Sequence, residues 1–382
     1  MQNPNLYPSR RDFIKTTAIA FGALAAAPSA FGDTPRSENA ASAQTRRFTI
    51  TQKYALQAPE GSGGVANLWI PLPDDQSFQR LTRLSFSGDY RDAYITTNND
   101  YGAKTLFATW NDAKKSPKID LSIEVETRDW ETAGALGDYR APKAIRYPKE
   151  VEPFLKPTKH MPVDGIVLKT AKKIVGSESN PLKKARLIYD WVSANMTRDN
   201  SIAGCGTGDV KAILESGKLV GKCTDINSVF VALARAVQIP ARETFGIRLG
   251  RAIKLERYSK TAFGSADENG LSNIGGAQHC RASFYLAGFG WVPCDAADVT
   301  KMRLTEKKEH KDAAVQAVNE YLFGNWEMNW IGFNCGRDFL LDPAPEQGAI
   351  NNFGYPYAEI GGDPLDYYDP KAFSYEYLSQ ER

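Results

Sequence analysis

The most informative pattern in the chain is a cysteine followed by a segment with helical periodicity. Downstream of Cys223, apolar side chains recur at Ile226, Val229, Phe230, Leu233 and Val237. This spacing places them on one face of an α-helix. Gly221 precedes the segment and Pro240 follows it, so the pattern predicts a helix that begins at Cys223 and is held by a core.

A cysteine at this position is a candidate nucleophile. The free N–H groups and the dipole at the start of a helix favour a negative charge, which lowers the pKa of a thiol there. The thiolate is the nucleophilic form of cysteine. The alternative is that Cys223 is a small buried apolar residue, which is the usual role of a free cysteine.

Composition excludes several classes of function. The 382 residues are enough for two domains, and a net charge of +2 gives no electrostatic reason to expect a nucleic-acid partner. With three histidines and no CxxC pair, a structural zinc site is not expected, and we predict no metal and no cofactor. The five cysteines leave at least one thiol unpaired. Disulfide pairing among Cys205, Cys280, Cys294 and Cys335 stays open.

The N-terminus resembles an export signal. Residues 9–15 read Ser-Arg-Arg-Asp-Phe-Ile-Lys and precede an Ala-rich, weakly apolar run, an order typical of a secretory signal. The paired arginines match the twin-arginine pattern at every fixed position. We expect residues 1–43 to be removed after Ala43, which would leave Gln44 as the first residue. The protein would then be periplasmic or otherwise exported by the twin-arginine translocase, with no membrane-spanning segment after signal removal.

The rest of the chain divides into four parts. Short alternating strands separated by Gly, Asp and Asn predict an antiparallel β-sandwich over residues 44–135. Prolines interrupt residues 136–164, which we interpret as a linker. Residues 165–305 carry helices and then strands, as in an α+β domain. Residues 306–382 form an aromatic-rich extension that we expect to wrap around the core, the alternative being a peptide-binding groove.

A hairpin is predicted between residues 278 and 295, with a Gly-rich turn at its centre. His279 begins its first arm and Asp295 ends its second, so the two side chains should lie close together. Asp298 is the alternative carboxylate partner for the histidine. Cys280 should point to the opposite face of its strand from His279, into the core.

These residue types fit nucleophilic catalysis. An imidazole removes the thiol proton and later donates a proton to the leaving amine. A carboxylate on the other ring nitrogen fixes the tautomer and stabilises the imidazolium. Cys223, His279 and Asp295 are therefore candidate catalytic residues.

The chain also resembles a known family. The resemblance rests on Gly221-x-Cys223-x-Asp225, Ala232-Leu233-Ala234-Arg235-Ala236, Ile239-Pro240-Ala241-Arg242, His279 and Trp291-Val292-Pro293-x-Asp295. Together they resemble the transglutaminase-like core, over roughly residues 165–305. An exported bacterial subgroup is similar also in the Gly204-Cys205-Gly206 loop and the Cys280-Arg281 pair.

The resemblance implies a papain-like fold whose triad is nucleophile Cys223, base His279 and orienting Asp295. It implies acyl transfer from peptide or isopeptide amides through a thioester. Hydrolysis, as in a cysteine peptidase or amidase, is favoured because no feature specifies an amine acceptor. The alternatives are a cross-linking transglutaminase and a non-catalytic module that binds an envelope peptide or protein. Peptidoglycan stem peptides, envelope proteins and imported peptides all stay open as substrates.

Overall fold

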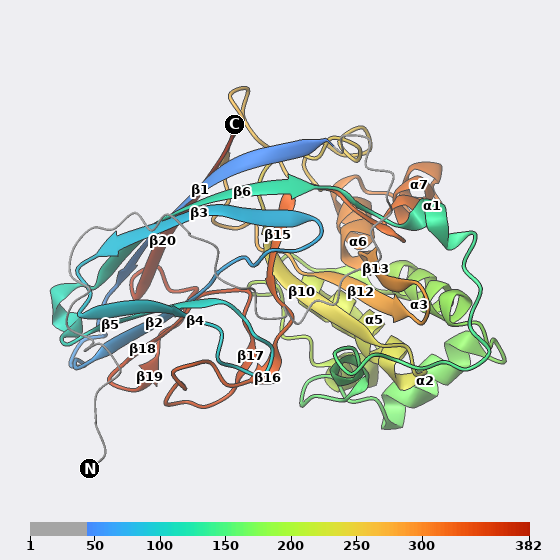
Figure 1. Ribbon diagram of the computed structural model, residues 1–382, viewed down its shortest axis with the longest axis horizontal. Helices are drawn as coiled ribbons and strands as arrows, with labels where there is room; N and C mark the ends of the chain where they lie inside the picture. Colours follow the sequence, from blue (N-terminus) through green and yellow to red (C-terminus); the bar gives the residue numbers. More distant parts are fainter. Residues whose placement is uncertain (1–43) are drawn as a thin grey trace, which may run out of the picture.

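The computed structural model describes residues 44–382, so the predicted signal peptide and the cleavage after Ala43 lie outside the described residues. A strand-rich region and a helical region flank a central four-stranded sheet (Figure 1). This mixed arrangement of sheets and helices confirms the predicted α+β class.

Two five-stranded sheets form the strand-rich region, with strand orders β11-β20-β1-β6-β3 and β19-β18-β2-β5-β4. Residues on β1 alternate between buried and more exposed positions, which places one face of the strand against the core. The strands are β1 (Thr45–Leu56), β2 (Ala66–Pro71), β3 (Gln79–Gly88), β4 (Asp92–Thr96), β5 (Thr105–Trp110), β6 (Lys118–Arg128), β11 (Leu271–Asn273), β18 (Tyr357–Ile360), β19 (Asp363–Pro364) and β20 (Phe373–Glu381).

Both ends of the described chain contribute to these sheets. Strand β20 pairs antiparallel with β1, from Phe48 opposite Glu381 to Leu56 opposite Phe373. Strand β18 pairs antiparallel with β2. The segment after residue 305, which was expected to wrap around the core, therefore contributes strands to both sheets.

The central sheet joins the strand-rich region to the helices. It is antiparallel, with the order β13-β12-β10-β15. Its strands are β10 (Ala241–Arg248), β12 (Arg281–Leu286), β13 (Gly290–Cys294) and β15 (Trp330–Asn334). On β10, Ala241 and Phe245 pack in the helical core, whereas Ile247 packs in the core of the strand-rich region. One strand thus ties the two cores together.

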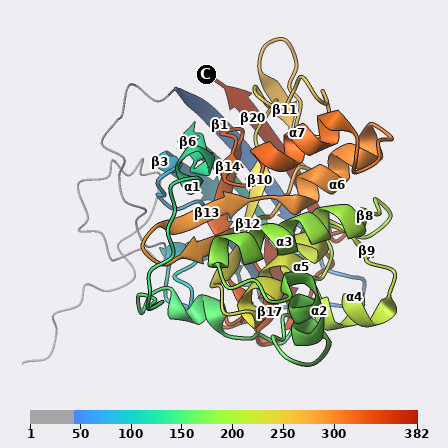
Figure 2. The same cartoon turned by 90° about the vertical axis from the view of Figure 1, so that its right-hand side faces the viewer.

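Helix α5 is the centre of the helical region. It spans Cys223–Ala236, as the apolar spacing predicted, and all of its residues are buried. It packs against α2, α3, β10 and β12 (Figure 2). The other α-helices are α1 (Ala133–Leu136), α2 (Gly165–Val175), α3 (Pro181–Asn195), α4 (Val210–Ser216), α6 (Ala296–Thr305) and α7 (Ala313–Tyr321).

Short elements complete the structure. They are the 3-10 helices η1 (Ala113–Lys115) and η2 (Glu152–Leu155) and the strands β7 (Trp130–Glu131), β8 (Thr197–Arg198), β9 (Val220–Gly221), β14 (Asn325–Trp326), β16 (Arg337–Phe339) and β17 (Ile350–Asn352). Strands β8 and β9 pair in parallel directly before α5. Within residues 44–382, no helix is both long and apolar enough to cross a membrane.

Candidate active site

Cys223 is the first residue of α5, and its side chain is buried. The turn before it is fixed by Asp225, whose Oδ2 accepts a hydrogen bond from the Lys222 backbone N–H at 2.9 Å. This is the role of a helix-capping carboxylate at a helix start. The thiol is therefore held where the helix dipole favours a thiolate.

A glycine-rich loop packs on the start of this helix. The Thr224 N–H donates to the Cys205 carbonyl at 2.9 Å, and the Gly208 N–H donates to Asp225 Oδ1 at 2.8 Å. A Cβ on Gly206 would lie 1.8 Å from Asp225 Oδ2, so only a glycine allows this approach. The loop brings the Cys205 sulfur beside the nucleophile candidate.

His279 lies just before β12, where its backbone is held on both sides. Its N–H donates to the Gly246 carbonyl at 2.9 Å, and its carbonyl accepts from Trp330 Nε1 at 2.8 Å. Its ring Nε2 lies 2.7 Å from Asp295 Oδ2. Asp295 is fully buried and caps α6 through the Asp298 N–H. The hairpin thus brings the predicted pair together, and ring atom Nδ1 is left for the thiol.

The charges around this histidine favour its protonated form. Burial lowers the pKa of His279, but the negative charges of Asp298 and Asp295 outweigh that effect and raise it above its ordinary value. Asp298 Oδ1 lies 3.4 Å from His279 Nε2, farther than the Asp295 oxygen. Asp295 therefore makes the shorter contact with the His279 ring, as predicted. Asp298 adds a second negative charge that favours the protonated ring.

Three thiols meet at the start of α5. Hydrogen bonds from Cys205 and Cys280 and the hydrogen bond and charge of His279 hold the pKa of the Cys223 thiol well below its ordinary value, although burial opposes them. The hydrogen bond with Cys223, together with burial, raises the pKa of the Cys205 thiol, and burial followed by the hydrogen bond with Cys223 raises the pKa of the Cys280 thiol. Of the three thiols, Cys223 is therefore the one whose pKa is lowered.

Cys280 packs in the helical core, as the sequence predicted. It is buried, as expected, but β12 begins only at Arg281. The alternation of a regular strand therefore does not apply to it, and its Sγ lies 3.6 Å from Thr224 Oγ1 on α5. All five cysteines are free thiols in this structure.

His279, Asp295 and Asp298 could each also offer a ligand atom to a cation, all within 4.8 Å of one another. However, Arg248 donates to both oxygens of Asp298, at 2.8 and 3.0 Å. Arg281 Nε lies 3.7 Å from Asp295 Oδ2. Two guanidinium groups already compensate the two carboxylates, so the cluster fits a protonated imidazole better than a metal ion.

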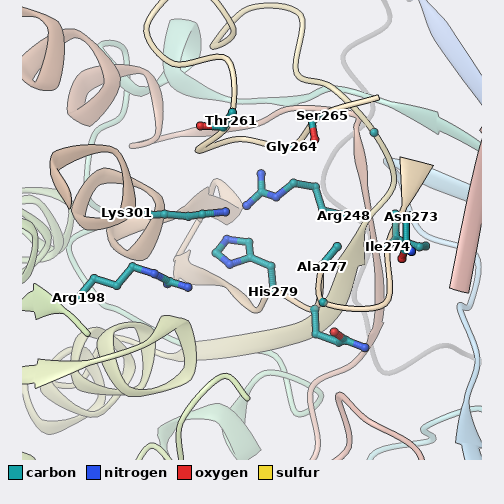
Figure 3. Close-up of a pocket in the computed structure, with 13 residues that line it drawn as sticks. Arg198, Arg248, Thr261, Gly264, Ser265, Asn273, Ile274, Ala277, His279 and Lys301 are labelled. Carbon is teal, nitrogen blue, oxygen red and sulfur yellow. The ribbon is translucent and has the colours of Figure 1, made fainter. Parts of the chain in front are cut away.

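A cavity of about 340 Å³ adjoins His279, and Arg198, Arg248 and Lys301 line it. Figure 3 shows these three basic side chains and His279 directed toward a common space. None of the three basic residues belongs to a motif that is recognisable in the sequence. They come from β8, β10 and α6, and no short motif links segments so far apart.

Comparisons with known proteins identify a family domain and a similar protein. The model of the transglutaminase-like superfamily core matches residues 168–296, a range that contains Cys223, His279 and Asp295. The chain is 59% identical to an uncharacterized protein of Haemophilus influenzae over 336 residues, which are 87% of this chain and 91% of that protein.

Two solved structures are also similar. A candidate cysteine protease from Cytophaga hutchinsonii has 16% identity and a TM-score of 0.46, covering 89% of this chain and 88% of its own. The periplasmic domain of TgpA from Pseudomonas aeruginosa has 12% identity and a TM-score of 0.33, covering 71% of this chain and 92% of its own.

Proposed function

Because this chain belongs to one family with the Haemophilus influenzae protein and carries a transglutaminase-like superfamily domain, we propose that it is a cysteine-dependent acyl-transfer enzyme. Its catalytic residues are Cys223, His279 and Asp295, within a catalytic domain at residues 165–305. The observation that carries the proposal is the 2.7 Å contact between His279 Nε2 and Asp295 Oδ2 beside a thiol of lowered pKa.

The reaction follows from these roles. The Cys223 thiolate attacks an amide carbonyl carbon, and a tetrahedral oxyanion forms. His279 donates its proton to the leaving nitrogen, the C–N bond breaks, and an amine leaves a thioester on Cys223. Water then gives its proton to His279 and attacks the thioester. The C–S bond breaks, a carboxylic acid leaves, and the Cys223 thiolate is regenerated beside the protonated His279.

Hydrolysis of peptide or isopeptide amides is the favoured outcome. An amine in place of water would give a new amide and make the protein a cross-linking enzyme. The two outcomes separate in one experiment, in which a peptide mixture is incubated with the protein and a dansylated primary amine. New free carboxylates without dansyl incorporation would support a peptidase or amidase, and dansylated products would support transamidation.

The proposal is tested first at the thiol. Iodoacetamide alkylation of Cys223 is followed by peptide mass spectrometry as a function of pH, in the wild type and in His279→Ala. The wild-type rate should stay high well below pH ~8.5, the ordinary pKa of a thiol, because the thiolate persists there. The variant should need a higher pH for the same rate, since the imidazolium charge is gone.

A second candidate function rests on the burial of Cys223, whose residue is 2% exposed. A module that binds an envelope peptide or protein needs no accessible thiol. A thiol that stays unreactive up to high pH in both proteins would contradict catalysis and favour this binding role.

We also propose export. The support is the sequence Ser-Arg-Arg-Asp-Phe-Ile-Lys at residues 9–15, which matches a twin-arginine signal. The mature protein would begin at Gln44. Replacement of Arg10 and Arg11 by lysine should keep the protein in the cytoplasmic fraction, and N-terminal sequencing of the exported protein tests the cleavage site.

A further inference from the structure

The cavity beside His279 contains more positive than negative charge. Of its three basic side chains, Arg248 is compensated, because its guanidinium donates to both oxygens of Asp298 and to the Phe263 carbonyl. Asp298 lies on α6, one turn before Lys301, and its carboxylate is already bound by this arginine and near the imidazole. The other two basic side chains, Lys301 and Arg198, have no carboxylate that pairs with them as Asp298 pairs with Arg248.

Lys301 carries an unmatched ammonium group. Among the described residues 44–382, this ammonium has no hydrogen-bond partner and no ion-pair partner. Burial and the charge of Arg248 lower the pKa of Lys301 to about 8, although Asp298 opposes them. The charge of Cys223 also raises the pKa of this lysine, so the ammonium lies within electrostatic range of the nucleophile candidate.

Arg198 carries a second unmatched donor. Its Nε donates to Asn200 Oδ1 at 2.9 Å, but its NH1 is buried and has no hydrogen-bond partner. A buried donor without a partner is costly, so native structures seldom leave one unsatisfied. The charge of Arg198 lowers the pKa values of both Lys301 and Cys205, so it lies near the cavity and near the thiols.

We propose that this cavity is the subsite for a carboxylate of the peptide substrate, bound by Lys301 and Arg198 beside His279. The inference rests on the proposed function and names its substrate class. A carboxylate supplies acceptors for the free Arg198 NH1 and a counter-charge for the lysine. The volume of about 340 Å³ holds such a group together with a neighbouring residue. The carboxylate could be the C-terminus of the peptide or an acidic side chain.

The test uses two alkylating reagents that differ in charge. Iodoacetate carries a carboxylate and iodoacetamide does not, and both consume the Cys223 thiolate. The ratio of their second-order rate constants therefore cancels any change in the thiolate fraction and isolates recognition of the carboxylate. In the wild type we expect this ratio to exceed that of glutathione by at least about tenfold, as one nearby unit charge at intermediate dielectric predicts.

The variants are Lys301→Met and Arg198→Gln, which remove charge while keeping most of the side-chain length. Each should lower the ratio by about tenfold. The control is Lys260→Met, the same substitution at an exposed lysine that does not line the cavity. Its ratio should equal the wild-type value. Thermal unfolding of each variant identifies any that fail to fold, and Arg198→Lys, which keeps the charge, should retain a raised ratio.

Two outcomes overturn the inference in distinguishable ways. If iodoacetamide reacts with Cys223 and the ratio is the same in all variants, the subsite is wrong and the proposed function stands. If neither reagent reacts, the proposed function fails, and the subsite fails with it because it would adjoin an inert thiol.

The source of the carboxylate is assigned by protection against iodoacetamide. N-acetyl-Ala-Ala presents a C-terminal carboxylate, and the amide of N-acetyl-Glu presents only a side-chain carboxylate. N-acetyl-Ala-Ala amide, which has neither, is the control. Protection by the first assigns the subsite to a peptide C-terminus, and protection by the second assigns it to an acidic side chain.

Discussion

His279 Nε2 lies 2.7 Å from Asp295 Oδ2, and this contact decides which nitrogen of the imidazole can serve the thiol. With Nε2 occupied, Nδ1 is the atom available to Cys223. The same histidine has Asp298 as a second, more distant acid at 3.4 Å. The two carboxylates therefore have separable roles, one in orientation and one in charge.

Asp295→Asn is expected to slow alkylation of Cys223 by iodoacetamide at pH 6 by about tenfold or more. An asparagine still caps α6, but it presents a neutral group to the ring and stabilises the imidazolium less. The matched variant is Asp298→Asn, which keeps an oxygen for Arg248. It should slow the reaction less, because Asp298 does not hold the ring. Equal losses in both variants would contradict the separate roles.

The neighbouring thiols are expected to lower the pKa of the Cys223 thiol. Cys205→Ala removes a hydrogen-bond donor, so the pKa of Cys223 should rise and its alkylation near neutral pH should slow. Cys335→Ala is the control, since Cys335 is a buried thiol that contacts Thr244 instead. The pH profile of alkylation should shift upward in the first variant only.

Stability should depend on pH through the Cys223–His279 pair. The folded pKa of Cys223 lies below its unfolded value of about 8.5, so its contribution is present above that value and is lost as pH falls through the folded pKa. The folded pKa of His279 lies above about 6.5, so its contribution is present below that value and is lost as pH rises through the folded pKa.

The pH dependences of the Cys223 and His279 contributions add up to one profile of stability against pH. The free energy of unfolding contributed by the pair should rise with pH up to about 6.5, stay level to about 8.5, and fall at higher pH. Urea titrations of the wild type and Cys223→Ala at several pH values measure it, because the cavity left by the alanine adds a pH-independent cost. A constant difference between the two proteins from pH 5 to pH 9.5 would rule out a folded-state ion pair.

The sequence predicted those elements of the fold that depend on residues close together in the chain, namely one helix and one hairpin. The apolar spacing after Cys223 indicated α5, and one short hairpin brought His279 and Asp295 together. The pairing of β1 with β20 was not predictable, because no local feature of either strand specifies a partner so distant in sequence. Strand β12 begins at Arg281, later than the start of the predicted hairpin at residue 278.

The basic cavity shows a further limit of sequence reasoning. Lys301 and Arg198 look like ordinary charged residues, since each lies alone in a polar segment. They become distinctive only when β8 pairs with β9 and α6 packs beside them. A buried donor without a partner marks Arg198, and the shared cavity beside Arg198 and His279 marks Lys301; both features arise only in the tertiary structure.

The loop that carries Cys205 offers a test of how the site is held. Gly206 has φ +88°, and a Cβ there would lie 1.8 Å from Asp225 Oδ2. Gly217 has φ +67° with open space around it, so Gly217→Ala isolates the backbone cost of about 1–2 kcal/mol. Gly206→Ala should cost about 1–3 kcal/mol more in the free energy of unfolding, because the loop must move off the start of α5.

The same displacement should also change the reactivity of the Cys223 thiol. When the loop moves, the Asp225 cap loses the Gly208 N–H and the Cys223 thiol loses Cys205 as a donor. Gly206→Ala should therefore raise the pH at which Cys223 is alkylated, whereas Gly217→Ala should only lower stability. Urea titration and the pH profile of iodoacetamide labelling measure the two effects separately. A loss of stability in Gly206→Ala with an unchanged labelling profile would mean that the loop supports the fold but not the nucleophile.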